Sequence, residues 1–148
     1  MSEMNRPYEI VIWGATGFTG RLVVEYLIQH HPEVSFAIAG RNQQKCQSLL
    51  DDLGVDLPIV IADAFDEVSL RAMVRQTQVV CTTVGPYSTY GHLLVDLCVE
   101  EGTHYCDLTG ESPFVRAVID KHHAVATEKN VSIVHACGFD SIPSDLGV

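Results

Sequence analysis

Short apolar runs alternate along this chain with longer stretches in which apolar residues recur at helical spacing. A short run of this kind is typical of a strand buried on both faces, and the longer recurrence is typical of a helix with one buried side. The alternation therefore predicts successive β-α-β units. The expected strands are residues 9–13, 35–39, 58–62, 79–83, 104–107 and 131–136. The expected helices are residues 18–30, 42–53, 66–76, 91–101 and 112–129.

Local signals accompany several of these helix ends. Asn42 is an expected N-cap, and Gly54 and Gly102 lie just beyond two expected helix C-termini. Ser112 is the expected N-cap of the last helix, with Pro113 at its first position. The apolar positions expected to face the core are Leu22, Val23, Tyr26 and Leu27 in the first helix, Leu70, Met73 and Val74 in the third, and Leu93, Leu94, Leu97 and Cys98 in the fourth.

Strands that are mostly apolar should be buried on both faces, which requires helices on both sides of a parallel sheet. We therefore predict a doubly wound α/β fold with about six strands in the order 3-2-1-4-5-6, because right-handed crossovers favour that arrangement. The switch point then lies between the first and fourth strands. Any ligand is expected at the carboxyl ends of those strands.

Length and charge narrow the class of protein. At 148 residues a single hydrophobic core can form, so residues 1–148 are interpreted as one domain. Nine basic and nineteen acidic side chains give a net charge of −10. A nucleic-acid partner is disfavoured, because phosphate neutralisation needs clustered basic residues and the lysines and arginines here are dispersed.

The sequence also bears on compartment and metals. No apolar stretch approaches the roughly 18 residues that span a bilayer, and the first eight residues lack a signal peptide's apolar stretch. We expect a cytoplasmic protein and leave peripheral contact with a membrane or lipid open. Five cysteines, an odd number without C-x-x-C spacing, favour free thiols. The histidines and cysteines match no zinc pattern, so no metal site is predicted.

The strongest motif is the run GATGFTG between the first expected strand and the first expected helix. Gly14 allows a tight turn, Gly17 lets the backbone approach a pyrophosphate, and Gly20 allows the helix to pack closely on the strand. Backbone N–H groups at the helix start then bind the anion. The G-x-x-G-x-x-G spacing is common among NADP-using dinucleotide enzymes and among nucleotide-binding proteins that are not enzymes. A purely structural strand-to-helix turn is the alternative. The residues predicted to contact the cofactor here are Gly14, Thr16, Gly17, Phe18, Thr19 and Gly20.

A second signal lies at the end of the second expected strand. An NAD enzyme places Asp or Glu about 20 residues beyond the glycines, where it accepts hydrogen bonds from the ribose 2′-OH. The residues here are AGRN, without a carboxylate, and Arg41 offers a guanidinium suited to a 2′-phosphate. We therefore predict NADP(H) as cofactor and keep NAD(H) as the alternative. A solvated arginine near the start of the next helix is the other interpretation of Arg41.

The segments that follow the third and fourth expected strands contain three further candidates for contact with the cofactor. Asp63 is placed to accept a hydrogen bond from the adenine amino group or to cap the next segment. Gly85 suits close approach to a ligand, and Tyr87 is placed to stack on the nicotinamide half or to donate a hydrogen bond to it. Packing of Tyr87 against the helix expected over residues 91–101 explains that tyrosine nearly as well.

Five motifs in order, GATGFTG, AGRN, VGPYSTYG, THYCDLTGE and CGFDSIPSDLG, resemble the saccharopine dehydrogenase-like oxidoreductases over essentially the whole chain. The resemblance implies the N-terminal NAD(P)-binding Rossmann domain of a polypeptide of several hundred residues, followed by a substrate and catalytic domain absent from this chain. Members of that family reduce or oxidise a C–N bond in lysine metabolism or, as trans-acting enoyl reductases, reduce a C=C bond in lipid biosynthesis. Some relatives without a settled activity associate with lipid surfaces.

By motif match the resemblance carries cofactor contact to Gly14, Gly17, Gly20 and Arg41, and less firmly to Gly85 and Tyr87. It assigns no catalytic residue. A small-molecule substrate is expected through the absent domain, and a homodimer is left open. The first hypothesis is thus a hydride-transferring oxidoreductase that uses NADP(H) and acts on a C=N or C=C substrate. The alternative is a dinucleotide-binding sensor or lipid-associated scaffold without turnover.

Other chemistry is less well supported. No tyrosine has a lysine four residues later, which excludes the Tyr-x-x-x-Lys mechanism of short-chain dehydrogenases within this chain. Acids that follow the fifth and sixth expected strands are candidates for proton transfer, although such acids more often cap helices or order loops. These acids are Asp107, Glu111, Asp140 and Asp145.

Overall fold

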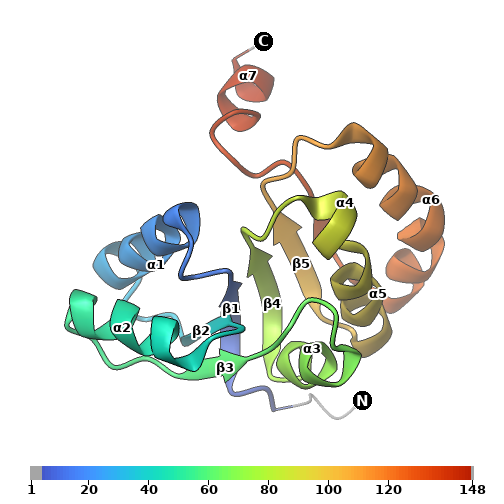
Figure 1. Ribbon diagram of the computed structural model, residues 1–148. Coiled ribbons are helices and arrows are strands. Elements are labelled where there is room, and N and C mark those ends of the chain that lie inside the picture. The colour runs from blue at the N-terminus through green and yellow to red at the C-terminus, as the bar shows by residue number, and fades with distance from the viewer. Residues whose placement is uncertain (1–4, 148) are drawn as a thin grey trace.

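The computed structural model describes residues 5–147 and contains the predicted parallel sheet, in the order β3-β2-β1-β4-β5-β6 (Figure 1). The strands are β1 (Tyr8–Trp13), β2 (Phe36–Gly40), β3 (Ile59–Ile61), β4 (Thr77–Thr82), β5 (His104–Asp107) and β6 (Ile133–Val134). The helices are α1 (Phe18–His30), α2 (Gln43–Leu53), α3 (Glu67–Val74), α4 (Tyr87–Tyr90), α5 (His92–Glu101), α6 (Ser112–Lys129) and α7 (Ile142–Leu146).

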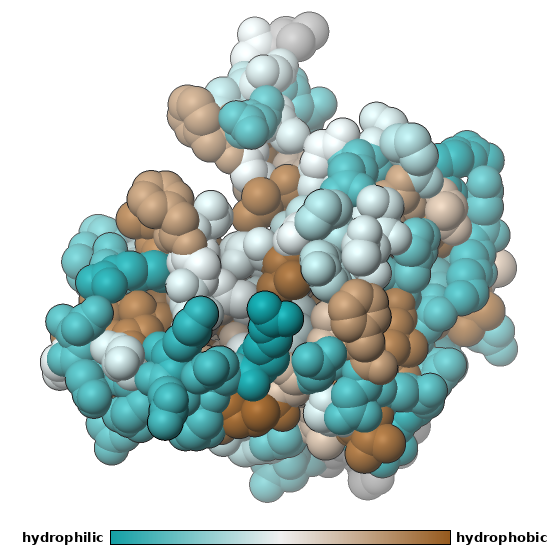
Figure 2. Space-filling model, in the orientation of Figure 1, coloured by the Kyte–Doolittle hydropathy of each residue, from teal (hydrophilic) through white to brown (hydrophobic). Residues whose placement is uncertain are grey.

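Helices cover the two faces of the sheet in two groups, and each group has its own core. On one face, α1 and α2 bury Ile12 and Ile38 of the central strands beneath side chains such as Val24. On the other face, α3, α5 and α6 enclose a larger core that includes Val80 and Tyr105. Figure 1 shows the first pair on one side of the sheet and the second group on the other, and Figure 2 shows that the outer surface over α2 is mainly hydrophilic. This is the doubly wound arrangement that the apolar strands predicted.

Three of the four predicted helix caps are observed. Asn42 accepts a hydrogen bond from the backbone N–H of Lys45, and both Gly54 and Gly102 adopt left-handed C-cap conformations. The prediction for Ser112 was wrong. Ser112 is the first residue of α6, and Glu111 occupies the N-cap position with its carboxylate bound elsewhere.

The buried side of α1 agrees with the prediction only in part. Val23 and Leu27 pack against the core as predicted, but Leu22 is 50 % exposed and Tyr26 is 55 % exposed, whereas Gly20 and Val24 are buried. Apolar residues occupy nearly every phase of this helix, so periodicity alone could not choose the side. The side is chosen by the sheet, because only Gly20 is small enough for the close approach at the end of β1.

The strand bounds and two short helices were also not predicted. β4 begins at Thr77 rather than at residue 79, and β6 ends after Val134. β6 is short because the chain turns away: Ala136 adopts a φ of +57°, and its N–H donates to Asp107 rather than extending the ladder. Neither α4 nor α7 carries a helical pattern long enough to be recognised. Among residues 5–147 no helix has the length and apolarity needed to cross a membrane.

Candidate functional site

The turn between β1 and α1 is closed by contacts that only glycine allows. Gly14 has a φ of +90°, and a Cβ there would lie 2.6 Å from Cγ2 of Val84. A Cβ on Gly20 would lie 2.1 Å from the carbonyl oxygen of Gly14. α1 therefore starts directly against the end of β1, with the close packing that the motif predicted.

The start of α1 presents unpaired backbone donors. The N–H groups of Phe18, Thr19 and Gly20 have no acceptor within residues 5–147, whereas the next one, of Arg21, donates to the carbonyl of Gly17. No acidic side chain lies in the first turn. Because a helix N-terminus carries partial positive charge, this end of α1 can hold an anion such as a pyrophosphate.

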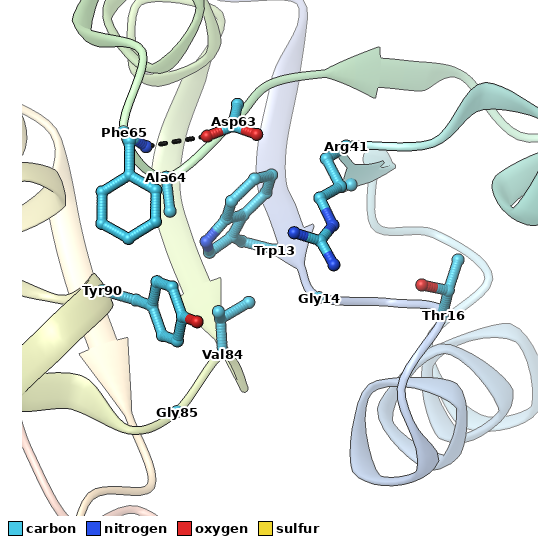
Figure 3. A pocket seen from close by; sticks show the side chains of 11 residues that line it. Trp13, Gly14, Thr16, Arg41, Asp63, Ala64, Phe65, Val84, Gly85 and Tyr90 are labelled. Atoms are coloured by element: carbon cyan, nitrogen blue, oxygen red, sulfur yellow. Dashed lines mark hydrogen bonds between the residues drawn. The ribbon is translucent and has the colours of Figure 1, made fainter.

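A cavity of about 280 Å³ lies beside this turn, at the carboxyl ends of β1 to β4 where the strand order reverses. Figure 3 shows the indole of Trp13 inside the ring of lining side chains, with Arg41 on one side of it and Tyr90 on the other. The position is the switch point at which open α/β sheets bind ligands. The lining residues are Trp13, Gly14, Thr16, Gly40, Arg41, Asp63, Ala64, Phe65, Val84, Gly85 and Tyr90.

Arg41 differs from the other arginines in having no partner within the described part of the chain. The sequence has six arginines, and five of them donate to carboxylates, backbone carbonyls or a hydroxyl. The guanidinium of Arg41 instead extends toward the cavity (Figure 3). In a chain with a net charge of −10, an unpaired guanidinium at a cavity is suited to an anionic ligand.

Asp63 lines the same cavity and also orders its own turn. Its Oδ1 accepts a hydrogen bond from the backbone N–H of Phe65 at 2.9 Å (Figure 3). Capping of the following helix α3 is done by Asp66, which accepts from the N–H groups of Val68 and Ser69. Contact between Asp63 and an adenine remains a prediction.

Two aromatic residues at the cavity were missed by the sequence reasoning. The rings of Phe65 and Tyr90 lie 5.3 Å apart between centroids, and both line the cavity. Phe65 is 69 % exposed, which is unusual for an aromatic side chain that serves packing alone. The available signal was the second tyrosine of VGPYSTYG, which the short helix α4 brings to the cavity.

Tyr87, the first tyrosine of that motif, does not line the cavity. Its side chain is buried, its hydroxyl donates to the carbonyl of Thr82 at 3.1 Å, and its ring packs against Phe114 of α6. Burial raises the pKa of Tyr87 to about 12. The side chain thus holds the loop after β4 in place, while Gly85 of the same loop does line the cavity. Tyr87 thus serves packing, in one core cluster with α5 residues such as Leu94 and with Phe114 of α6.

Glu111 ties this loop to the start of α6. Its carboxylate accepts hydrogen bonds from the backbone N–H groups of Tyr87 at 2.6 Å and Ser88 at 2.9 Å. Hydrogen bonds from Ser88 and Tyr87 lower the pKa of Glu111, so it is held as a carboxylate. Its observed role is to fix the first turn of α4.

Asp107 is the centre of a buried polar cluster. It contacts the Tyr105 hydroxyl and His135 Nδ1, and it accepts from the N–H groups of Thr109 and Ala136. Burial alone would raise its pKa, but the hydrogen bonds from His135, Thr109 and Tyr105 outweigh burial and lower it. Asp107 therefore orders the loops after β5 and β6.

The remaining predicted acids lie apart from the cavity. Asp140 and Asp145 are exposed in and before α7, and neither lines the cavity beside the glycine turn. Within residues 5–147, no group of three or more His, Cys, Asp or Glu side chains is arranged to hold a metal ion. Of the predicted contacts, Gly14, Thr16, Arg41, Asp63 and Gly85 line the cavity, and Gly17, Phe18, Thr19 and Gly20 form the adjacent turn and helix start.

Comparison with known proteins shows which family this chain is similar to. Residues 10–134 match the model of the saccharopine dehydrogenase NADP binding domain. A trans-acting enoyl reductase of Mycobacterium ulcerans is 48 % identical over 151 residues, covering 100 % of this chain and 36 % of that protein. A trans-acting enoyl reductase of Mycobacterium tuberculosis is 46 % identical with the same coverage. The chain thus spans about a third of the length of these relatives.

Solved structures share the fold at low sequence identity. Apo saccharopine dehydrogenase from Saccharomyces cerevisiae superposes with a TM-score of 0.74 at 17 % identity, over 90 % of this chain and 28 % of that chain. A Citrobacter triphenylmethane reductase complexed with NADP(H) gives a TM-score of 0.64 at 21 % identity, over 86 % of this chain and 48 % of that chain. These likenesses support the architecture described above.

Proposed function

This chain belongs to the family of saccharopine dehydrogenase NADP-binding domains, and on that premise we propose that it holds NADP(H) in the cavity beside the glycine turn for an enoyl reductase. The unpaired guanidinium of Arg41 is the observation that carries the choice of cavity and cofactor. It stands where the second strand ends, beside the glycine turn, and no carboxylate occupies that strand end.

The residues present fit a dinucleotide phosphate. The free N–H groups at the start of α1 would hold the pyrophosphate, and Arg41 would hold the 2′-phosphate. Phe65, Tyr90 and Asp63 would hold the adenine, because they offer aromatic faces and one carboxylate. When bound, NADPH supplies a hydride from its nicotinamide ring.

We propose that the bond reduced is C=C rather than C=N. Support comes from the two mycobacterial relatives, which are named enoyl reductases and are nearly half identical to this chain throughout its length. Because this chain corresponds to about a third of such relatives, the domain works within a longer polypeptide that contributes the substrate site. The chain's own contribution is to bind and orient the cofactor, since Asp63 is the one acid of residues 5–147 that lines the cavity, and it also orders its own turn.

Trp13 provides the assay for cofactor binding. It is the sole tryptophan of the chain, it is 3 % exposed, and it lines the cavity. NADPH and NADH titrations followed by Trp13 fluorescence should show tighter binding of NADPH. A charge-assisted hydrogen bond contributes about 1.5–3 kcal/mol, so Arg41→Gln should weaken NADPH binding roughly 10- to 150-fold. NADH binding should be unchanged, because NADH lacks the 2′-phosphate.

Arg116→Gln is the matched control. Arg116 is an exposed arginine that pairs with Asp120 on α6, away from the cavity. Equal weakening of NADPH by both variants, or parent binding of NADH as tight as that of NADPH, would refute the role of Arg41.

Turnover separates the enzyme from the alternative of a sensor or scaffold. The longer polypeptide is mixed with NADPH and either an enoyl thioester or an imine, and the loss of NADPH absorbance and the products are recorded. Consumption with the enoyl substrate alone is expected. NADPH binding without its oxidation by either substrate class would favour the non-catalytic alternative.

A further inference from the structure

One row of side chains crosses the sheet from a covered half to an uncovered half. The row consists of residues that are paired in register across neighbouring strands and that lie on the side of the sheet covered by α1 and α2, namely Ile38, Ile12, Cys81, Cys106 and Val134. Exposure rises along the row: Ile38 is 0 % exposed, Ile12 is 1 % exposed, Cys81 and Cys106 are half-buried, and Val134 is 51 % exposed. The sheet thus loses its cover toward β6.

The uncovered half has a definite composition. We call it the open face, defined by Val79, Cys81, His104, Cys106 and Val134, all of which are half-buried or exposed. None of these side chains carries a carboxylate, ammonium or guanidinium group, and the His104 Nδ1 accepts from the N–H of Ser132. The open face therefore consists of aliphatic and thiol side chains with one histidine, in a strongly acidic chain.

The opposite side of the same strands is covered more completely, although Ile133 of β6 is only half-buried there. Tyr105, between His104 and Cys106 on β5, is 1 % exposed beneath α5 and α6. Parallel strands are normally buried on both faces, because their crossovers place helices on each side. On the α1 side of the sheet, Cys81 of β4 still packs partly against the core under α1 and α2, whereas within residues 5–147 β5 and β6 are left as a strip without a covering helix beside α1.

The width of the strip indicates what covers it. Neighbouring strands lie about 4.8 Å apart, so the two strands β5 and β6 present a strip about 10 Å wide. One α-helix with its side chains has a diameter of about 10–12 Å. A single amphipathic helix with an aliphatic side therefore fits the open face.

We infer that the open face binds one amphipathic α-helix from the longer polypeptide, which lies beside α1 over β5 and β6 and reaches the exposed edge of Cys81 on β4. This inference rests on the proposal that the domain works within a longer polypeptide. The curated relatives are long enough to contain such a helix outside the matched region, since this chain matches only 36 % of their length. The helix completes the second layer of the sheet in the same way that α1 and α2 complete it over β1 to β3.

The five cysteines allow a direct test. Cys81 and Cys106 lie on the open face, whereas Cys46 and Cys98 are 0 % exposed within the two cores. Alkylation by N-ethylmaleimide, followed by peptide mass spectrometry, gives a rate for each thiol in the 148-residue chain and in the longer polypeptide. Comparing each thiol with itself cancels differences in intrinsic reactivity. We expect Cys81 and Cys106 to react about tenfold or more slowly in the longer polypeptide.

Cys46 and Cys98 report the fold, and they should stay slow in both forms. Fast reaction of these two thiols in the 148-residue chain would mark unfolding, and the comparison is then repeated within the longer polypeptide alone. There, Val134→Glu should restore fast reaction of Cys81 and Cys106, because a charge would be buried against the helix. Val125→Glu is the control, since Val125 is 42 % exposed on α6, on the other side of the sheet.

The outcomes separate the occupants. Protection in the longer polypeptide that Val134→Glu removes and Val125→Glu keeps supports the inference. Equal rates in both forms, with no effect of Val134→Glu, overturn it. Protection that appears in the 148-residue chain and grows with its concentration also overturns it, in favour of a second copy. NADPH titration by Trp13 fluorescence on the same samples tests the cofactor proposal separately.

Discussion

Replacement of Gly20 by alanine tests the link between the glycine turn and the fold most sharply. Gly20 is the third residue of α1 and is buried against the preceding turn. A Cβ at this position would lie 2.1 Å from the oxygen and 2.8 Å from the carbon of the Gly14 carbonyl, and 2.9 Å from Cα of Ala15. All three atoms are backbone, so no side-chain rotation relieves the overlap.

Two effects of opposite sign compete in Gly20→Ala. Helix propensity alone favours alanine over glycine by about 1 kcal/mol. Overpacking of a tight site costs about 1–3 kcal/mol, and the backbone contact at 2.1 Å places this site at the upper end. The expected net change is a loss of about 2 kcal/mol, or about 4–8 °C in Tm for a chain of this size. NADPH binding should weaken as well, because the turn must open to accept the methyl group.

Urea unfolding followed by far-ultraviolet circular dichroism measures the change in stability, and Trp13 fluorescence measures NADPH binding. Gly54→Ala is the control: its φ is +65°, nothing lies within 4 Å of the new methyl group, and it is remote from the cavity. The left-handed conformation should cost about 1–2 kcal/mol and leave cofactor binding unchanged. If Gly20→Ala is as stable as the parent or more stable, the gain in helix propensity equals or exceeds the cost of overpacking, and the steric reasoning is refuted.

Three further predictions concern the cavity, the polar cluster and a helix cap. Phe65→Ala should weaken the binding of NADPH and of NADH alike, by about tenfold, because an aromatic pair contributes about 0.5–1.5 kcal/mol beyond its buried area. If only NADPH binding weakens, Phe65 does not contact the adenine that both cofactors share. Asp107→Asn should destabilise the fold at pH 7 by about 1.5–3 kcal/mol. Because the folded pKa of Asp107 lies below its ordinary value of 3.8, this difference should persist above that pH and shrink as the pH falls below it; a constant difference from pH 7 to pH 3 in urea unfolding would contradict the assignment. Asp66→Ala should lower the stability by about 1 kcal/mol through loss of the α3 cap, whereas Asp66→Asn should retain most of it in the same measurement.

The strand order and the glycine turn could be predicted because they depend on local pattern. An uninterrupted apolar run marks a strand covered on both faces, and a glycine triplet between a strand and a helix fixes where the turn lies. Arg41 could be placed at the cavity for the same reason, since it follows β2 directly and only the end of that strand had to be located. Such features need no knowledge of distant contacts.

The loop after β4 could not be resolved in this way. Which of Tyr87 and Tyr90 faces the cavity is decided by the carboxylate of Glu111, 24 residues away from Tyr87 in the chain. That contact fixes the first turn of α4 and sends the ring of Tyr87 toward Phe114. No spacing in the sequence encodes a contact of this kind.

The bounds of β6 have a similar non-local cause. The pattern of residues 131–136 continues as a strand, yet Asp107 captures the N–H of Ala136 and the Nδ1 of His135. A buried carboxylate must satisfy its hydrogen bonds, and two of the groups that bind Asp107 lie directly after β6. The preference of a local segment is thereby overridden by a charge on its neighbour.

The contact between Glu111 and α4 has a consequence for how this fold can vary. One wall of the cavity is Tyr90, at the end of α4, and the beginning of α4 is held by the residue that immediately precedes α6. The connection between β5 and α6 is therefore not an independent loop. An insertion or deletion there, made to admit a different substrate, would shift the anchor and move the wall against which the adenine is proposed to rest. Divergence of substrate preference in proteins of this architecture should accordingly proceed by exchanging residues of that connection at constant length, or by changing the rest of the polypeptide.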